Sequence, residues 1–516
     1  MNYAVSIGHQ FHVDVLSRFE RETNCSFGFI NYSERGNFHG DYKVLDKFIK
    51  KVKLKCPSVI LESILEGLFP ENYFRFFNVP WVITESDILK YKNIESISTR
   101  LMDRSAIVPI SSFSRRRFYL ILLNYYSFIL EHQNIQGLIT FDTPHSFFSI
   151  VLYELCRQKG IKTIQLEYHF LTEYSIVKNS YDWPIIPKEY MVNNSKEEIK
   201  NSLSTNLSHV IFKNSKILED YKSFETKRIV KNNIFSNLKL YVRFIDKALK
   251  NMAMGTFPFL FKKEILHFSS LNGIKNRFEY RWILNKQLIK LIRLNIYYNK
   301  LVNINLDLNH PYIFVGFHMQ PEKTSQPMGG EFDNQLMMVK VLSESVPEGW
   351  KVYVKEHPNQ FNVKKVPNRH YRDKLMYDLL HRMDNVELVP LEIDSIDLIN
   401  NSQMVATLTG TMGWEAITRN IPAIVFGDTY YMSCRATRVV RDVDSCKRAI
   451  LELQKLNRNE MEIEIYRYIS FYFKNNFLVQ CANWQAMFKF ITIRYEEQIE
   501  NLVEKFVYFH NKNLEH

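Results

Sequence analysis

The chain has 516 residues, of which 46% are hydrophobic, 24% charged and 14% aromatic, and it contains only 16 glycines and 16 prolines. This composition excludes collagen-like, low-complexity and wholly disordered proteins. At about 100–200 residues per domain, the length favours several domains or one large enzyme with two lobes.

The net charge of +12 comes from 67 Lys and Arg against 55 Asp and Glu, and it is concentrated in one segment. Residues 227–300 contain sixteen basic residues and only three acidic ones. The chain has no zinc-finger spacing, aromatic RNA-binding strand or P-loop, so a nucleic-acid partner is not favoured. We expect the basic segment to face an anionic membrane surface instead.

The N-terminus lacks the features of a signal peptide, and the longest apolar run, residues 118–130, is too short and too polar to span a bilayer. We therefore expect a cytoplasmic protein. The six cysteines are scattered without the spacing of metal ligands, which predicts reduced thiols and no metal site.

In the first 200 residues, short apolar runs alternate with longer amphipathic stretches, a pattern that predicts parallel strands joined by helices. The expected strands are residues 59–64, 79–84, 137–142 and 161–168. The clearest helix, residues 146–158, begins after an Asp-Thr-Pro turn and stops before Lys159-Gly160. We expect residues 1–200 to form a Rossmann-like domain.

Residues 201–305 contain no convincing series of strands and form a basic helical connector in this interpretation. Within residues 238–251 the apolar side chains follow helical spacing, and a separate face carries Lys239, Arg243, Lys247 and Lys250. Such a helix can lie on anionic lipid, or it can be an ordinary surface helix packed on the core. The sequence leaves both possibilities open.

A second alternating series predicts a Rossmann-like domain over residues 306–458. The expected strands are 312–317, 350–357, 385–390, 404–410 and 422–428, and the expected helices are 334–345, 371–383, 395–401, 412–419 and 443–456. Residues 459–516 show only helical patterns. The predicted fold class is α/β, similar to the GT-B arrangement: two Rossmann-like domains facing a cleft, a basic connector and C-terminal helices.

Ligands of open parallel sheets bind at the carboxyl ends of the strands, so the residues that follow each strand are the candidates for chemistry. His357 follows one strand, and Pro358 keeps it out of helical geometry, where its imidazole can meet a phosphate. Lys355 adds positive charge beside it. A coincidental turn is the alternative for this His-Pro pair.

Two strands later, Thr409, Gly410 and Thr411 form a turn before a helix, where backbone N–H groups and hydroxyls can bind an anion. Glu415 follows in that helix. Its carboxylate can accept both ribose hydroxyls of a nucleotide, or it can belong to a helix capping box. Together with His357, this pattern favours nucleotide binding.

The long loop after the first strand of the second domain is unusually polar and includes His318, Gln320, Glu322 and Gln335. Its Gly329-Gly330 pair would let the backbone approach a ligand closely. Asp333 stands where the next helix begins. It can cap that helix, or its carboxylate can face a developing oxocarbenium centre as base or nucleophile.

The equivalent strand ends of the first domain carry Asp142, His145 and Glu167. An acidic residue at this position could deprotonate an acceptor hydroxyl, and Glu167 is the preferred candidate because it closes a buried strand. Asp142 can instead cap the helix 146–158, and His145 can be a surface residue.

Residues 318–336, 348–361 and 407–431 resemble the bacterial capsule polysaccharide biosynthesis family, which includes the β-Kdo transferases of capsule and lipopolysaccharide assembly. The His-Pro pair and the hydroxyl-rich turn are also similar to motifs of bacterial sialyltransferases, which use CMP-sugars. The resemblance implies that His357 and the turn at Thr409 hold the phosphate of CMP, and that Glu415 lies near the ribose. Asp333 and Gln335 match an Asp-x-Gln element in which the Asp is the nucleophile of a retaining double displacement.

The resemblance implies a glycosyltransferase of bacterial surface polysaccharide synthesis, peripheral on the inner membrane. It would transfer an acidic ulosonic sugar such as Kdo from a CMP donor to a glycan or glycolipid acceptor, with no metal or other cofactor. Transfer from a UDP-sugar, or of an alditol phosphate from a CDP donor, is the enzymatic alternative. The alternative without catalysis is a membrane-bound adaptor of a polysaccharide assembly complex.

Overall fold

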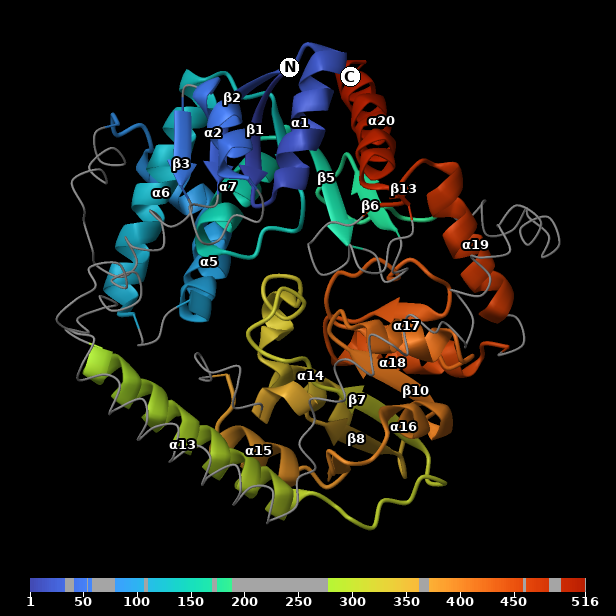
Figure 1. The fold of residues 1–516 in the computed structure, drawn as a ribbon. Helices are drawn as coiled ribbons and strands as arrows, with labels where there is room; N and C mark the ends of the chain where they lie inside the picture. The colour runs from blue at the N-terminus through green and yellow to red at the C-terminus, as the bar shows by residue number, and fades with distance from the viewer. Residues whose placement is uncertain are drawn as a thin grey trace. The chain divides into compact units, whose positions relative to one another are not determined.

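The computed structural model describes residues 1–32, 41–52, 54–57, 79–105, 110–168, 174–187, 277–361, 371–457, 461–481 and 493–515 (Figure 1). These residues fall into two compact units. Unit 1 lies within Met1–Pro184 and Phe471–His516, and unit 2 lies within Ile185–Ser270 and Ile274–Ser470. The expected strand 59–64 and the basic helix 238–251 lie outside the described residues.

Unit 1 contains a seven-stranded sheet in the order β13-β6-β5-β4-β1-β2-β3. The strands are β1 (Asn2–Ile7), β2 (Ser26–Tyr32), β3 (Leu54–Pro57), β4 (Gly137–Thr140), β5 (Lys162–Tyr168), β6 (Ser175–Lys178) and β13 (Leu478–Val479). The run from β3 to β5 is parallel, and β6 is antiparallel to both of its neighbours. The first five strands therefore have the Rossmann-like order 3-2-1-4-5, which reverses between β1 and β4.

Helices cover both faces of this sheet. They are α1 (Gln10–Thr23), α2 (Tyr42–Lys50), α4 (Glu85–Lys90), α5 (Lys92–Ser105), α6 (Ser112–His132), α7 (Phe147–Gln158) and α20 (Tyr495–Leu514). One core contains buried side chains of α5, α6 and α7, and the other contains those of α1 and α20. Each face of the sheet thus has its own hydrophobic core.

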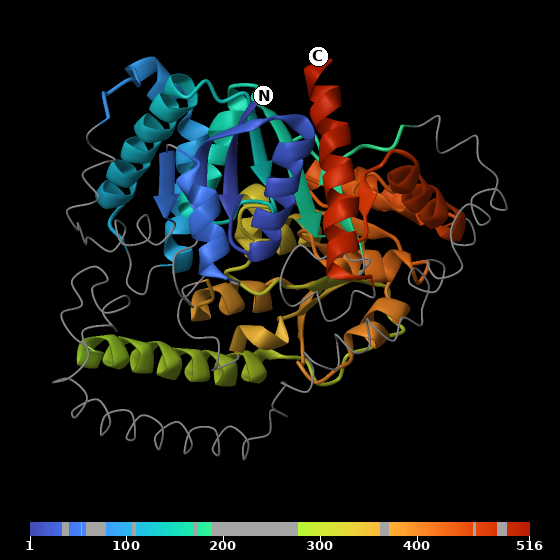
Figure 2. The same ribbon diagram turned by 45° about the horizontal axis from the view of Figure 1, so that its top comes forward.

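The C-terminal helix α20 returns to the sheet that begins the chain, and Figure 2 shows it beside α1. Leu502, Phe506 and Phe509 follow helical spacing and are fully buried. Phe506 makes an edge-to-face contact with Phe19 of α1, with ring centroids 5.8 Å apart. The apolar stripe of this charged helix therefore completes the core of unit 1.

Residues 79–84 were expected to form a strand, and this prediction is wrong. They lead into α4, whose first turn is closed by a capping box between Thr84 and Asp87. Asn124 of α6 accepts a hydrogen bond from the amide of Val82 at 2.7 Å, which satisfies part of this backbone without a sheet. Thr84 and Asp87 favour the start of a helix and Pro80 disfavours a strand, so the apolar run does not form a strand here.

Unit 2 contains a six-stranded parallel sheet in the order β12-β11-β10-β7-β8-β9. The strands are β7 (Tyr312–Gly316), β8 (Lys351–Lys355), β9 (Val386–Val389), β10 (Met404–Thr407), β11 (Ala423–Val425) and β12 (Thr437–Val439). In chain order this is 3-2-1-4-5-6, the doubly wound order that reverses between β7 and β10. The five strands expected from the sequence are confirmed, as is the α/β fold with two parallel-sheet domains.

The helices of unit 2 pack on both faces of its sheet, as the continuous apolar strands require. They are α13 (Arg277–Leu301), α14 (Gln335–Ser343), α15 (Lys374–His381), α16 (Ser395–Asn401), α17 (Thr411–Ile417) and α18 (Val443–Gln454), with two short 3-10 helices, η5 (Gly330–Asp333) and η6 (Pro358–Phe361). Helix α19 (Met461–Lys474) begins in unit 2, and its residues from Phe471 onward belong to unit 1. In the described part of the chain, no helix combines the length and the apolar character needed to cross a membrane.

Candidate functional site

The carboxyl edge of the unit 2 sheet brings the loops after β7, β8 and β10 together at the point where the strand order reverses. His318, just after β7, contacts the turn after β10. Its Nε2 accepts hydrogen bonds from the hydroxyl of Thr407 at 2.9 Å and from the amide of Thr409 at 3.4 Å. Two donors on Nε2 leave the ring proton on Nδ1, which faces the hydroxyl of Thr324 at 3.2 Å.

Burial, aided by the nearby His357 and Arg372, lowers the pKa of His318 to about 3. The imidazole is therefore neutral at physiological pH and acts as a hydrogen-bonding bridge between two loops. Gly410 makes room for it: a Cβ at this position would lie 2.8 Å from Thr407 Oγ1 and 3.1 Å from the ring of His318. His318 thus contacts the turn at Thr409, which the sequence predicts to bind a nucleotide.

Thr409 is fixed in this turn by its hydroxyl, which donates to the carbonyl oxygen of Thr324 at 2.7 Å. Thr411 is exposed and begins α17. The residue at the N-cap of α17 is Gly410, and no side chain caps the helix, so the capping-box interpretation of Glu415 is wrong. Glu415 itself is half-buried in the second turn of α17.

A buried arginine that the sequence analysis missed ties the loop after β7 to the end of β8. Arg372 is 2% exposed and forms an ion pair with Glu356, with Nε 2.6 Å from Oε2. Its guanidinium also donates to the carbonyl oxygen of His318 at 3.0 Å and to the side chain of Gln320. Tyr377 donates to the same carboxylate at 2.7 Å. No sequence pattern connects Arg372 with a carboxylate sixteen residues earlier.

Gln335 and Gln320 are buried and hold the polar loop in shape. The Gln335 side chain accepts from the amide of His318 at 2.7 Å and donates to the Gln320 side chain at 2.9 Å. Gln320 in turn donates to the carbonyl oxygen of Asp333 at 2.7 Å. Much of the loop's polarity therefore satisfies its own backbone, and a contact of either glutamine with a donor sugar stays a prediction.

Asp333 ends η5 and is half-buried. The residue that caps α14 is Asn334, whose side chain accepts from the amide of Leu336, so the helix-cap interpretation of Asp333 is wrong. The Asp333 carboxylate instead accepts from the Gln326 amide at 3.0 Å. Glu322 is half-buried in the same loop. A role of the Asp333 carboxylate in the reaction stays a prediction.

Gly329 approaches the backbone of its own loop, whereas Gly330 has open space where a Cβ would lie, so close approach of a ligand to this pair stays a prediction. A Cβ on Gly329 would lie 2.5 Å from the carbonyl oxygen of Ser325. The close approach that this glycine permits is therefore to the loop's own backbone.

His357 follows β8 and is half-buried. Its Nδ1 accepts from the amide of Asn359 at 3.1 Å, so the proton of the neutral ring lies on Nε2. Lys355 is buried, and its ammonium group donates to the carbonyl oxygen of Ile393 and to Ser395 Oγ at 3.1 Å. Burial lowers the pKa of Lys355 to about 8. These contacts tie Lys355 to the loop after β9.

The carboxyl edge of unit 1 carries the other candidates. Asp142 and His145 follow β4 with side chains 39% exposed, and Oδ2 of Asp142 lies 4.0 Å from Nδ1 of His145. Glu167, near the end of β5, is buried and 1% exposed. Ser146 caps α7 together with Ser149, so the helix-cap interpretation of Asp142 is wrong.

Two histidines just after β1 were not singled out from the sequence. His12 is buried and stacks on Phe141, with ring centroids 4.0 Å apart, and its Nδ1 accepts from the amide of Gly8. His9 makes an edge-to-face contact with His12. The only available signal was a His-x-x-His spacing directly after an apolar run.

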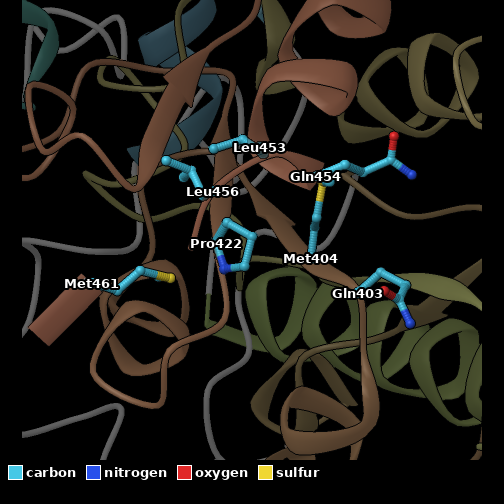
Figure 3. Close-up of a pocket in the computed structure, with 7 residues that line it drawn as sticks. All are labelled: Gln403, Met404, Pro422, Leu453, Gln454, Leu456 and Met461. Atoms are coloured by element: carbon cyan, nitrogen blue, oxygen red, sulfur yellow. The ribbon is translucent and has the colours of Figure 1, made fainter. Parts of the chain in front are cut away.

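A cavity of about 220 Å³ lies elsewhere in unit 2 (Figure 3). Gln403 and Pro422 directly precede β10 and β11, which places the cavity at the amino edge of the sheet. It is lined by Gln403, Met404, Pro422, Leu453, Gln454, Leu456 and Met461. Because ligands of doubly wound sheets bind at the opposite edge, we do not assign the cavity to the site.

Among the described residues, no group of three or more His, Cys, Asp and Glu side chains could hold a metal ion. Five cysteines in this part of the chain are free and buried: Cys25, Cys156, Cys434, Cys446 and Cys481.

Residues 239–438 match the family model described as "Capsule polysaccharide biosynthesis protein". No curated protein matches the chain by sequence. Similar solved structures include the KpsC β-Kdo 2,7 transferase of Thermosulfurimonas dismutans, with 11% identity over 92% of this chain and 99% of that chain and a TM-score of 0.30. The KpsC β-Kdo 2,4 transferase of the same organism has 14% identity over 65% of this chain and 79% of that chain, with a TM-score of 0.27.

Another similar structure is the UDP-GlcNAc 2-epimerase of Methanocaldococcus jannaschii. It has 11% identity over 89% of this chain and 94% of that chain, with a TM-score of 0.23.

Proposed function

We propose, from the premise that this chain belongs to the capsule polysaccharide biosynthesis family through residues 239–438, that it is a glycosyltransferase of bacterial surface polysaccharide synthesis. The donor would be a CMP-activated acidic sugar of the ulosonic type, such as Kdo, and the acceptor a glycan or glycolipid. The match with this family spans the strands of unit 2 and the loops that follow β7, β8 and β10.

The observation that carries the proposal is the meeting of His318 with the Thr407–Gly410 turn at the reversal point of the unit 2 sheet. This point is where doubly wound sheets bind nucleotides. Thr409, Gly410 and Thr411 belong to that turn, and His357 follows the neighbouring β8 with its ring proton on Nε2. The amides of Thr409 and Gly410 and the Thr409 hydroxyl already bond within unit 2, so the proposal takes His357 and Thr411 as the donors that would stabilise the leaving phosphate.

In this proposal His357 and the turn bind the phosphate of CMP, Glu415 binds the ribose, and Lys355 adds a positive charge at the same edge. A CMP-sugar has a single phosphate and needs no metal bridge across a pyrophosphate. His318, Gln320 and Gln335 hold the loop that carries Glu322 and Asp333 toward the sugar.

Asp333 would act as the nucleophile of a retaining double displacement. Its carboxylate forms a bond to the anomeric carbon while the bond from that carbon to the phosphate oxygen breaks, and CMP leaves with the electron pair. The acceptor oxygen then displaces Asp333 and loses its proton to a base. Asp142, His145 and Glu167 are the candidates that the sequence offers for this base, and Glu167 is the one preferred there.

We further propose that residues 227–300, with sixteen basic and three acidic residues, hold the protein on the anionic inner surface of the membrane. Association with anionic vesicles should then be stronger than with neutral vesicles and should weaken as salt is added. Replacing Lys239, Arg243, Lys247 and Lys250 together should weaken it further. Equal association with both kinds of vesicle at low salt would reject this role.

The function is tested by incubating the protein with a panel of activated donors and measuring product masses, alongside thermal unfolding with CMP, UDP or CDP. The proposal predicts stabilisation by CMP and a product that carries an acidic sugar. Stabilisation by UDP or CDP, with the matching product, would support the alternative transferases. No response to any nucleotide and no product would favour an adaptor.

A further inference from the structure

The loop that follows β11 packs against the Thr409–Thr411 turn that follows β10. Tyr431 of this loop is fully buried, and its hydroxyl donates to the carbonyl oxygen of Gly410 at 2.5 Å. Thr429 is 1% exposed, and its hydroxyl donates to the carbonyl oxygen of Thr409 at 3.3 Å. Two successive carbonyl groups of the turn are therefore held by one neighbouring loop, and all of these residues belong to unit 2.

Two glycines permit this close packing. A Cβ on Gly413, in the first turn of α17, would overlap the hydroxyl of Tyr431. Gly427 lies near the start of the loop after β11, and a Cβ there would lie 2.5 Å from the carbonyl oxygen of Met328 and 2.6 Å from Cγ2 of Thr409. The loop after β11 is therefore packed against both the turn and the loop after β7.

Tyr431 remains a hydrogen-bond donor at any pH at which the protein is assayed. Burial raises the pKa of its phenol, so the hydroxyl keeps its proton. The carbonyl oxygen of Gly410 also accepts from the amide of Gly413 at 3.2 Å, at the start of α17. Removing the tyrosine hydroxyl should therefore loosen the turn without unfolding α17.

The bonds to the two carbonyl groups determine where the next residue of the turn is placed. A trans peptide unit is planar, so its C=O and N–H point in opposite directions. With the Gly410 carbonyl bonded to Tyr431, the direction of the Thr411 amide and the position of the Thr411 Cα are fixed. Thr411 is exposed, whereas Tyr431 and Thr429 are buried. A ligand of the turn can therefore contact Thr411, and the two buried hydroxyls act on that ligand only through the turn.

We propose that Tyr431 and Thr429 are positioning residues that hold the turn in the orientation in which Thr411 donates to a phosphate. This role rests on the proposed function, in which Thr411 and His357 stabilise the phosphate of CMP. No proton or bond of the reaction passes through either buried hydroxyl. The phosphate site then includes the loop after β11 as well as the turn.

The test is calorimetric titration of CMP into the wild type and into Tyr431→Phe, which keeps the ring and removes only the hydroxyl. We expect CMP to bind the variant about three- to tenfold more weakly, which is the effect of one lost hydrogen bond. The matched control is Tyr312→Phe. Tyr312, at the start of β7, is also fully buried, and its hydroxyl donates to the carbonyl oxygen of Leu398 at 2.7 Å. The control should lose similar thermal stability but bind CMP as the wild type does.

A double-mutant cycle tests whether Tyr431 acts through Thr411. Thr411→Ala removes the hydroxyl that is proposed to contact the phosphate. If Tyr431 positions this hydroxyl, adding Tyr431→Phe to Thr411→Ala should lower CMP affinity by less than about twofold. A tyrosine that only stabilises the fold would have the same effect on CMP affinity in both backgrounds.

Thr429→Val keeps the shape of the side chain and removes the second hydrogen bond. CMP binding should weaken by about two- to threefold, less than in Tyr431→Phe, because the bond to Thr409 is long at 3.3 Å. If Tyr431→Phe does not fold, Thr429→Val decides the matter. A CMP affinity equal to that of the wild type would then overturn the positioning role.

Wild-type CMP affinity in folded Tyr431→Phe, equal losses of affinity in Tyr431→Phe and Tyr312→Phe, or an undiminished loss in the Thr411→Ala background would overturn the positioning role while leaving the proposed function in place. No binding of CMP to the wild type would overturn the proposed function, and the positioning role with it. The wild-type titration therefore separates the two failures before any variant is measured.

Discussion

The carboxyl edges of the two sheets use polar side chains in opposite ways. In unit 2, the residues around the reversal point are buried and bonded to one another, so they fix backbone positions. In unit 1, the carboxylate of Glu167 is buried, whereas the side chains of Asp142 and His145, in the turn after β4, are half-exposed. The comparison teaches that the polar side chains at this edge of unit 2 are used to fix the loop backbone, whereas two ionisable side chains at the edge of unit 1 remain partly exposed.

The largest expected effect is on Asp333, the carboxylate of the unit 2 loop that we propose as the nucleophile. Asp333→Asn removes the charge but keeps the size, and Asn334 caps α14, so stability should change little. Turnover should fall by at least about 1,000-fold because an amide is a poor nucleophile and does not stabilise positive charge at the anomeric carbon. Steady-state kinetics checks this.

The matched control for Asp333 is Glu331→Gln, which removes an exposed carboxylate from the same 3-10 helix. It should keep wild-type turnover. An active Asp333→Asn enzyme would remove Asp333 from the chemistry, and equal losses in both variants would point to a general effect of charge in this loop.

The next effect compares the buried cations of the two units. Arg372→Met leaves Glu356 without its ion-pair partner and should lower the free energy of unfolding of unit 2 by about 3–5 kcal/mol. Lys178→Met in unit 1 should cost less, because its ammonium group lies 3.9 Å from Glu167 and Glu167 keeps two other hydrogen-bond donors. Denaturant unfolding checks both variants.

Arg382→Met replaces an exposed arginine at the end of α15 and should change the unfolding free energy by no more than about 0.5 kcal/mol. A loss for Lys178→Met that equals or exceeds that for Arg372→Met would contradict the description of unit 2 as the more tightly fixed edge.

A third effect depends on pH. The pKa of His318 is about 3 in the folded protein and about 6.5 when the chain is unfolded, so the unfolded chain binds a proton that the native chain excludes between these values. The contribution of the neutral His318 to the free energy of unfolding is therefore present above pH 6.5 and is lost as the pH falls. Between pH 6.5 and 5 the loss should be about 2 kcal/mol.

His318→Gln should therefore make the stability of unit 2 less dependent on pH in this range, although the variant is less stable at pH 7. His381→Gln, an exposed histidine of the same unit, should leave the pH dependence unchanged. If plots of the unfolding free energy against pH run parallel for wild type and His318→Gln between pH 5 and 7, His318 is not held neutral by burial.

The smallest effect concerns the space beside the imidazole of His318. Gly410→Ala places a methyl group 2.8 Å from Thr407 Oγ1 and 3.1 Å from His318, and both neighbours must shift by a few tenths of an ångström. The loss of stability should be about 1 kcal/mol, with weaker CMP binding. Thr411→Ala, at the exposed next position, should leave stability unchanged. Equal melting temperatures for Gly410→Ala and wild type would show that the turn is not packed as described.

The sequence predicted five of the six strands of unit 2, β7 to β11, because fully buried parallel strands are continuous apolar runs bounded by turn residues. It also placed α16 at Ser395–Asn401, where Asp394 supplies a recognisable cap. The two-residue strand β13 could not be found in this way, because its pairing with β6 depends on the tertiary fold.

The sequence singled out polar residues near strand ends: His357 and Thr409 come two residues after β8 and β10, and Glu167 lies one residue before the end of β5. The sequence could not show that Arg372 would pair with Glu356, because no periodicity relates them and the contact is set by packing. For the same reason it did not distinguish the buried Glu167 from the accessible His145. Which polar residues contact a ligand and which support the backbone depends on burial.

The central claim is that the carboxyl edge of unit 2 binds the phosphate of a CMP-sugar through His357. Calorimetric titration of CMP into the wild-type protein and into His357→Ala tests it most directly, with thermal unfolding as the check on the fold. We predict that CMP binds the wild type and that the folded variant binds at least about tenfold more weakly, a difference of about 1.4 kcal/mol. Equal CMP affinities in the two proteins, or no binding of CMP to the wild type, would contradict the account.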